Sequence, residues 1–372
     1  MKITGITVYQ CDLPLADPYW LSGGRLKFEV LDATFVKLET DAGPVGWGEG
    51  TPWGHTYVPA HGPGIRAGME TMAPAILGLD PRKVELVERA MDLCLPGHLY
   101  AKAPVDLACW DILGQASGLP IADCLGGKRE TGTWAASSVS SGEPDYMLDI
   151  IEKYRAMGYR AHSAKVGGSD TGKDIERIRH LEAHRRPGEV ILYDVNRAWT
   201  RREAIVVMNA VADLGVTFEQ PCETLDDIAA IRPVTTSPIS VDETLVTLQD
   251  ACRIARHGIA DVFGIKLNRV GGLSKARRIR DVALAHGIQM FVMATGGSVM
   301  ADTEAAHLAQ SIPQDFIRAG WSCQDMLTVD VAPGNGCRCI DGMMTIDQTP
   351  GLGCVPDEDI LGDPVAIYRD QA

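Results

Sequence analysis

The feature that most constrains the fold is a series of eight short β-rich segments between residues 133 and 321, each separated from the next by a stretch of helical length and amphipathic pattern. Such regular alternation of strand and helix predicts a parallel β/α barrel. An open Rossmann-type sheet is the alternative, but no GxGxxG pattern follows the first segment. The eight segments are TWAASSV (133–139), AHSAKVG (161–167), VILYDVN (190–196), VTFEQP (216–221), PISVDET (238–244), VFGIKLN (262–268), MFVMATG (290–296) and DFIRAGW (315–321).

The residues before and after this alternation have a different pattern. Strand and turn signals alternate over residues 1–50, where DAG (41–43) separates two β-rich runs, and helical patterns follow at 66–95 and 101–118. The residues after the last segment are rich in turn signals, and we expect them to return to the first unit. The predicted units are an α+β capping domain at 1–130, the barrel at 131–322 and a returning C-terminal segment at 323–372.

Composition favours a small metabolite as the partner. The 372 residues carry a formal net charge of −14, which disfavours nucleic acid and anionic membrane surfaces. The ten cysteines are scattered, which favours reduced thiols over a disulfide framework or a zinc site. The start MKITGITVYQ has no signal-peptide pattern, and no run reaches the roughly 18 apolar residues of a membrane span. We therefore predict a cytoplasmic protein.

Charged residues end five consecutive segments of the predicted barrel, from the second to the sixth. They are Lys165, Asp194, Glu219, Asp242 and Lys266, and the last four are 25, 23 and 24 residues apart. Each interval is one β/α unit, so the five side chains are expected at the C-terminal mouth of the barrel, where such folds place their chemistry.

Three carboxylates brought together at this mouth would repel one another unless a cation lay among them. Asp194, Glu219 and Asp242 supply hard oxygen ligands, which suit Mg²⁺, and the absence of His and Cys at these positions disfavours zinc. The alternative for any one of them is that it only caps the following helix.

The two lysines are predicted to lie on opposite sides of the bound substrate. HSAKVGG (162–168) places Lys165 before a glycine pair, and GIKLNRVGG (264–272) repeats the arrangement around Lys266. A proton beside a carboxylate is weakly acidic, but a metal that stabilises the resulting enediolate makes its removal feasible. We expect the cation and partial burial to lower the lysine pKa. The alternatives are a surface lysine that extends its stem along apolar groups, and a barrel that binds without catalysis.

These motifs resemble the enolase superfamily, and within it the muconate lactonizing enzyme subgroup. GPVGWGE (43–49) and VDLACWDILGQASGLPIADCLGG (105–127) are similar to its capping-domain signatures, and DVN, EQP, DET and KLNRVGG to its barrel signatures. MFVMATGG lacks the histidine of the mandelate racemase type. The resemblance implies a modified TIM-type (β/α)7β barrel, an α+β capping domain formed by both ends of the chain, one Mg²⁺ per subunit and a homo-oligomer.

The resemblance also implies a substrate site and a reaction. The subgroup usually has Lys-x-Lys on the second strand, but Ser163 replaces the first lysine here. Aromatic capping loops at 17–25 and 51–62 are expected to face the substrate rather than the metal, and TGGS (295–298) to hold its carboxylate. The predicted substrate-binding residues are Ser163, Asn196, Tyr19, Trp20, Trp53, His55, Tyr57, Thr295, Gly296, Gly297, Ser298 and Trp321.

The pattern is similar to subgroup enzymes that act on proline derivatives. We expect dehydration of cis-3-hydroxy-L-proline to Δ1-pyrroline-2-carboxylate, with 2-epimerisation at the same site. The alternative is a racemase or epimerase of proline betaine, of 4-hydroxyproline betaine or of another amino acid derivative.

Overall fold

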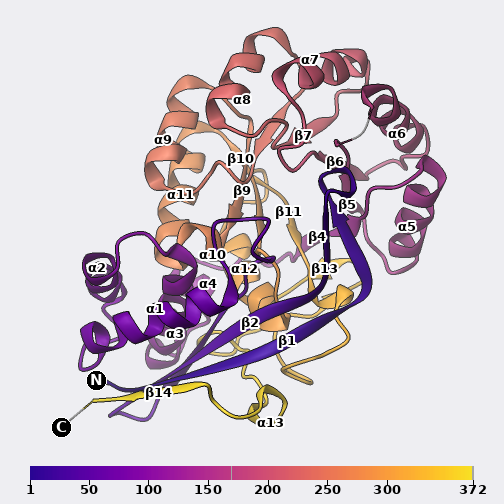
Figure 1. Cartoon of the computed structure of the whole chain (residues 1–372). Coiled ribbons are helices and arrows are strands. Elements are labelled where there is room, and N and C mark those ends of the chain that lie inside the picture. The colour runs from indigo at the N-terminus through magenta and orange to yellow at the C-terminus, as the bar shows by residue number, and fades with distance from the viewer. Residues whose placement is uncertain (169, 371–372) are drawn as a thin grey trace.

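Eight parallel strands close into a barrel in the computed structural model, which describes residues 1–168 and 170–370 (Figure 1). The ring closes because the last strand pairs with the first through Gly320 and Ala135 and through Trp321 and Ala136. The predicted barrel and its eight segments are therefore confirmed. The strands are β4 (Thr133–Val139), β5 (Ala161–Lys165), β6 (Val190–Asp194), β7 (Thr217–Glu219), β8 (Ile239–Val241), β9 (Val262–Lys266), β10 (Gln289–Met293) and β11 (Ile317–Trp321).

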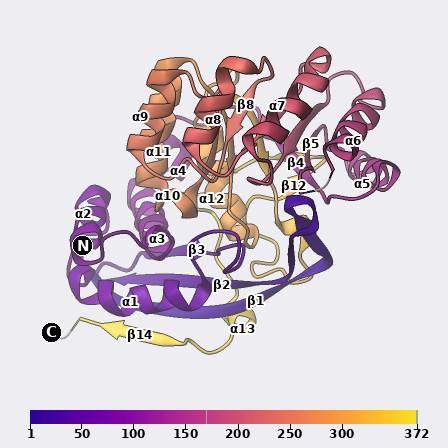
Figure 2. The same cartoon turned by 45° about the horizontal axis from the view of Figure 1, so that its top comes forward.

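Helices surround the barrel (Figure 2). Local signals fix their ends: Thr200 and Thr247 form capping boxes with the acidic residues three positions later, and Gly258 ends its helix in the left-handed conformation. The helices are α5 (Pro144–Ala156), α6 (Thr171–Ala183), α7 (Arg201–Ala210), α8 (Leu225–Ile231), α9 (Leu248–His257), α10 (Leu267–Val270), α11 (Leu273–His286) and α12 (Val299–Gln310), with 3-10 turns at Ala212–Leu214 and Arg232–Val234. Within the described residues, no helix has both the length and the apolar character needed to cross a membrane.

An antiparallel sheet and four helices form the cap. The strands β1, β2, β3 and β14 pair in the order β14-β1-β2-β3, so the C-terminal strand adds to the N-terminal sheet. The elements are β1 (Ile3–Leu21), β2 (Leu26–Thr40), β3 (Val45–Gly50), β14 (Ala366–Arg369), α1 (Gly62–Ile76), α2 (Val84–Cys94), α3 (Leu99–Ser117) and α4 (Ile121–Cys124).

The β1–β2 hairpin extends from the cap to the barrel mouth (Figure 1). Its tip is a 3-10 turn at Ser22–Gly24, and the Ser22 hydroxyl donates to the backbone carbonyl of Asn196 at 3.0 Å. The predicted capping loop at 17–25 is therefore the end of a long paired hairpin. Because strand pairing continues through Leu21 and Leu26, the tip is held in place by backbone hydrogen bonds.

The helix α3 lies unusually close to β3. An added Cβ at Gly46 would lie 2.1 Å from the carbonyl oxygen of Ala108, and one at Gly48 would lie 2.1 Å from that of Pro104. Only glycine permits this approach of backbone to backbone. The glycines of the motif GPVGWGE at positions 46 and 48 are therefore explained by the packing of β3 against α3.

The C-terminal segment contacts the barrel before it returns to the cap. After the 3-10 turn Gln324–Met326, the short strands β12 (Cys339–Ile340) and β13 (Met343–Met344) form a hairpin, and β13 pairs antiparallel with β4. The helix α13 (Glu358–Leu361) and β14 follow. The predicted unit boundaries at 130 and 322 stay a prediction, and residues 371 and 372 lie outside the described residues.

His307 on α12 joins three parts of the chain. The backbone N–H of Ala122 donates to its Nδ1 at 3.2 Å, so the proton is on Nε2, which donates to the carbonyl of Leu352 at 2.9 Å. Burial lowers the pKa of His307 to about 4. The neutral ring therefore links the barrel to the cap connection and to the C-terminal segment.

We predict that His307 makes the protein less stable in mild acid. Its folded-state pKa lies below the ordinary 6.5, so its stabilisation is complete above pH 6.5 and is lost as pH falls through about 4. In urea titrations at pH 7, 5 and 4, His307→Gln should show a smaller loss of unfolding free energy than the unsubstituted protein. His257→Gln, at an exposed position, should not change the pH profile. Parallel profiles for all three proteins would contradict this role.

Candidate functional site

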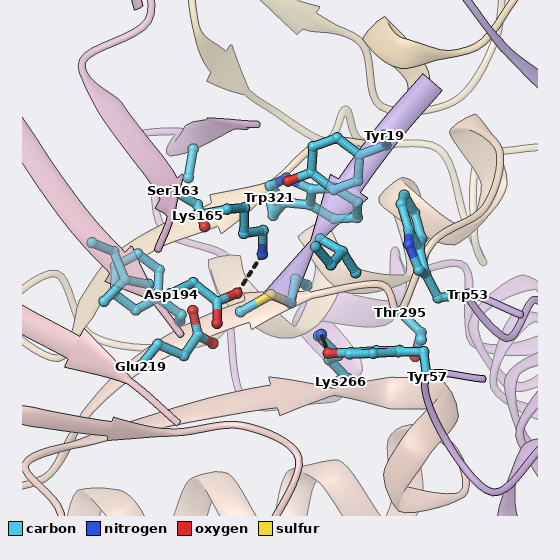
Figure 3. A pocket seen from close by; sticks show the side chains of 15 residues that line it. Tyr19, Trp53, Tyr57, Ser163, Lys165, Asp194, Glu219, Lys266, Thr295 and Trp321 are labelled. Atoms are coloured by element: carbon cyan, nitrogen blue, oxygen red, sulfur yellow. Dashed lines mark hydrogen bonds and ion pairs between the residues drawn. The ribbon is translucent and has the colours of Figure 1, made fainter. Parts of the chain in front are cut away.

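A pocket lies at the C-terminal mouth of the barrel, between the barrel and the cap (Figure 3). The cap contributes aromatic and aliphatic side chains, and the barrel contributes the charged ones. The lining residues are Tyr19, Leu21, Trp53, Tyr57, Ala136, Ser163, Lys165, Leu192, Asp194, Glu219, Lys266, Phe291, Met293, Thr295 and Trp321.

One side of the pocket carries an ammonium and two carboxylates at the ends of β5, β6 and β7. Strand register pairs Lys165 with Asp194 and Asp194 with Glu219, so parallel pairing alone makes them neighbours. Lys165 forms an ion pair with Asp194 Oδ2. Asn196 fixes the same carboxylate, because its backbone N–H donates to Oδ1 at 2.9 Å and its Nδ2 donates to Oδ2 at 3.1 Å.

The other side of the pocket is built around Asp242, one residue beyond β8. Lys266 Nζ donates to Asp242 Oδ2 at 2.8 Å and to the Tyr57 hydroxyl at 2.9 Å. That hydroxyl in turn donates to Asp242 Oδ2 at 3.0 Å. Figure 3 shows Lys165 and Lys266 entering the pocket from two sides. The convergence of the five charged residues is therefore observed in the geometry.

The expected lowering of the lysine pKa is not seen at Lys165. Burial acts to lower this pKa, but the nearby Asp194 and Tyr19 oxygens raise it above its ordinary value. The side chains of this chain thus favour a protonated ammonium at position 165. Because the expected lowering depends on a bound cation, it stays a prediction for the site with metal.

Several carboxylates of the mouth lie close enough to repel one another. Burial first, and then Asp194 and Asp242, raise the pKa of Glu219 well above its ordinary value. Burial and Asp242 likewise raise the pKa of Glu243 to about 7, and its buried Oε2 has no hydrogen-bond partner among the described residues. Repulsion of this kind is relieved by a divalent cation, and all the available donors are hard oxygens.

The three predicted metal ligands do not surround a common point in the structure. In the part of the chain that the structure describes, no three His, Cys, Asp or Glu side chains are positioned to hold an ion together. The reason is that Lys165 and Lys266 form ion pairs with Asp194 and Asp242 and so take up carboxylate oxygens that a metal ion would need. The donor set fits a hard cation, provided that these carboxylates exchange their ammonium partners for it.

Six of the predicted substrate-binding residues line the pocket, and the others do not. Trp20 is 38% exposed and stacks with Lys27, and His55 is exposed on the surface. Trp20 points away because neighbours on a strand alternate between the two faces. Asn196 acts on Asp194 rather than on the cavity. Tyr57 does line the pocket, but it also touches Asp242, a predicted metal ligand. The six are Tyr19, Trp53, Tyr57, Ser163, Thr295 and Trp321.

The TGGS loop connects the barrel to the cap through hydrogen bonds and close packing. Ser298 donates from its backbone N–H and its hydroxyl to Glu49 of β3, at 3.0 and 2.5 Å, and caps the start of α12. An added Cβ at Gly297 would lie 2.5 Å from Glu49, and one at Gly296 would lie 2.3 Å from the Trp53 ring. The carboxylate-binding role of Gly296, Gly297 and Ser298 therefore stays a prediction, and of the four loop residues only Thr295 lines the pocket.

Arg269 is a site residue that sequence reasoning missed. Its guanidinium donates to Asp242 Oδ1 at 2.5 Å and to the carbonyls of Gly264 and Leu245. Burial acts to raise the pKa of Asp242, but Arg269 and Lys266 outweigh it and hold that pKa below its ordinary range. The signal was present in KLNRVGG, where the arginine follows the lysine by one helical turn.

We predict that Arg269 is a structural requirement of the site. Arg269→Met removes one cation from a buried group and should lower the free energy of unfolding by about 3 kcal/mol, measured by urea titration. Arg277→Met breaks a more exposed pair with Glu85 and should cost at most about 1 kcal/mol. Similar small losses for both variants would contradict the prediction.

Known proteins resemble this chain over nearly its whole length. Residues 146–360 match the family described as Enolase C-terminal domain-like, and residues 4–126 match the Mandelate racemase / muconate lactonizing enzyme, N-terminal domain. A cis-3-hydroxy-L-proline dehydratase from Roseibium aggregatum is 40% identical over 99% of this chain and 100% of its own length.

Solved structures agree with these matches. A protein from Silicibacter pomeroyi, described as a putative mandelate racemase/muconate lactonizing enzyme, is 66% identical, with a TM-score of 0.96 and complete coverage of both chains. An enolase superfamily member from Roseovarius nubinhibens, complexed with magnesium, is 49% identical, with a TM-score of 0.95 over 99% of this chain and 100% of that one.

Proposed function

Because the chain belongs to the mandelate racemase/muconate lactonizing enzyme family of the enolase superfamily, we propose that it is a Mg²⁺-dependent enzyme that removes the α-proton of a carboxylate substrate. The proposed substrate is cis-3-hydroxy-L-proline, and the proposed product is Δ1-pyrroline-2-carboxylate. The observation that carries the proposal is the pair of lysines that enter one pocket beside an acidic cluster. The 40% identity to a dehydratase supports the choice of reaction.

The proposed Mg²⁺ ligands are Asp194, Glu219 and Asp242. Their hard oxygens and their mutual repulsion at Glu219 suit this ion. Bound Mg²⁺ supplies a Lewis acid that stabilises the negative charge of the enediolate. The magnesium complex of a relative that is 49% identical supports this assignment.

The proton chemistry belongs to the lysines. One of Lys165 and Lys266 takes the α-proton, and a lysine on the side of the hydroxyl gives a proton to it as the C3–O bond breaks. Neither lysine is more than 8% exposed, so water is largely excluded from these transfers. The resulting enamine becomes the cyclic imine product.

Epimerisation at C2 is a second candidate function. The two lysines enter from different sides of the pocket, so a proton removed by one can be replaced by the other. The same residues would then racemise or epimerise proline derivatives that lack a leaving group, including the betaines.

The proposal is tested with cis-3-hydroxy-L-proline and L-proline in D₂O containing Mg²⁺. We expect loss of water from the first and α-deuterium uptake by the second, both followed by mass spectrometry. An enzyme that gives deuterium uptake with a broad panel of amino and hydroxy acids but never with these two would contradict the proposed substrate. No uptake with any of them would instead favour a binding protein.

Removal of the metal should abolish activity. In EDTA we expect a loss of roughly 10³-fold or more, because a Lewis acid contributes several kcal/mol to such a step. Mg²⁺ should restore the rate in the unsubstituted protein but not in Glu219→Gln. Full activity in EDTA would refute the role of the cation.

Each lysine should act on one face of the α-carbon. Lys165→Ala should lose α-deuterium exchange with one enantiomer of proline and Lys266→Ala with the other, each by about 10²- to 10⁴-fold. Epimerisation needs both faces and should vanish in both variants. Lys173→Ala, on the exposed side of α6, serves as the control. Equal losses with both enantiomers, or normal epimerisation in either variant, would rule out the two-base arrangement.

A further inference from the structure

Trp53 carries a buried indole N–H that has no acceptor. The side chain is 2% exposed and lines the pocket, yet Nε1 has no hydrogen-bond partner among the described residues. In Figure 3 its nitrogen lies on the edge of the ring that faces the other labelled side chains. Trp321, in the same wall, is different, because its Nε1 donates to the Ser138 hydroxyl at 2.7 Å.

The Trp53 ring is held in this orientation from several directions. Its centroid lies 5.5 Å from Tyr19, 5.8 Å from Phe28 and 5.6 Å from Trp321, all in edge-to-face contacts. The absence of a Cβ at Gly296 leaves the space that the ring fills. A buried donor without a partner is costly, so a ring fixed in this way favours a ligand that brings an acceptor.

We propose that the indole N–H of Trp53 donates a hydrogen bond to the C3 hydroxyl oxygen of the substrate and so selects hydroxylated prolines. This inference rests on the proposed function. The substrate ammonium carries only donors, and its carboxylate is assigned to the Mg²⁺ side of the pocket. The C3 hydroxyl is then the remaining hydrogen-bond acceptor of the substrate, and the aromatic side of the pocket is the remaining surface that can bind it.

The role of Trp53 is to orient and not to transfer a proton. In the elimination, the electrons of the α-C–H bond form the C2–C3 double bond and the C3–O bond breaks. A lysine supplies the proton with which the hydroxyl leaves as water, and the other lysine keeps the α-proton. The indole is too weak an acid to give up its own proton, but its hydrogen bond stabilises the departing oxygen.

The test compares a hydroxylated substrate with one that lacks the hydroxyl. For Trp53→Phe we expect kcat/KM for dehydration of cis-3-hydroxy-L-proline to fall roughly threefold to tenfold, the worth of one hydrogen bond. Exchange of the L-proline α-proton in D₂O should fall less than dehydration does, because L-proline has no hydroxyl to accept this hydrogen bond. Leu21→Val changes another side chain that lines the pocket, one without a hydrogen-bonding group, and should change both reactions equally.

A second measurement keeps the inference testable if Trp53→Phe does not fold. In Lys165→Ala, with Mg²⁺, one of the seven indole N–H resonances should shift on adding cis-3-hydroxy-L-proline and not on adding L-proline. Equal kinetic effects of Trp53→Phe on both substrates, no effect on dehydration, or identical spectra with both ligands would overturn the role of Trp53 alone. Absence of both reactions in the unsubstituted protein would overturn the proposed function, and this inference with it.

Discussion

Buried lysines and carboxylates share the mouth of the barrel, and removing such charges from water costs several kcal/mol for each ion. They are tolerated because they pair: Lys165 with Asp194, and Lys266 and Arg269 with Asp242. The pairing leaves Glu219 without a cation in contact, beside two other carboxylates. The mouth therefore holds, among the described residues, a carboxylate with no ion-pair partner in a site from which water is largely excluded.

The cap covers this charged mouth. A β-hairpin extends from the capping sheet to the barrel and is anchored there by the Ser22 hydroxyl. The backbone of α3 packs directly against β3 at Gly46 and Gly48, and Glu49 of the same strand accepts hydrogen bonds from Ser298 at the start of α12. The hydrogen bonds of Ser22 and Glu49 connect the cap to the barrel through buried polar groups, so the pocket between them has a defined shape.

The pocket divides into a charged floor and an aromatic wall. The floor belongs to the barrel strands and carries the lysines and carboxylates to which we assign the proposed proton transfer. The wall comes largely from the cap, where Tyr19 and Trp53 meet Trp321 of β11. This separation lets one part of the chain keep the reaction while another part changes the substrate, because the two surfaces are carried by different elements.

The sequence by itself determined the barrel, the capping sheet and the convergence of five charged residues, because strand spacing and strand ends are local properties of the chain. It also predicted Tyr19, Trp53 and Tyr57 as pocket residues from their position in aromatic segments. Only the tertiary structure excluded Trp20 and His55, since the direction of a side chain depends on the pairing of its strand. Tertiary contact likewise decided that TGGS joins the cap to the barrel, that Arg269 pairs with Asp242, and that Lys165 has a raised pKa. In each case the partner is remote in sequence, and only folding brings the two charges or hydrogen-bonding groups within a few ångströms of each other.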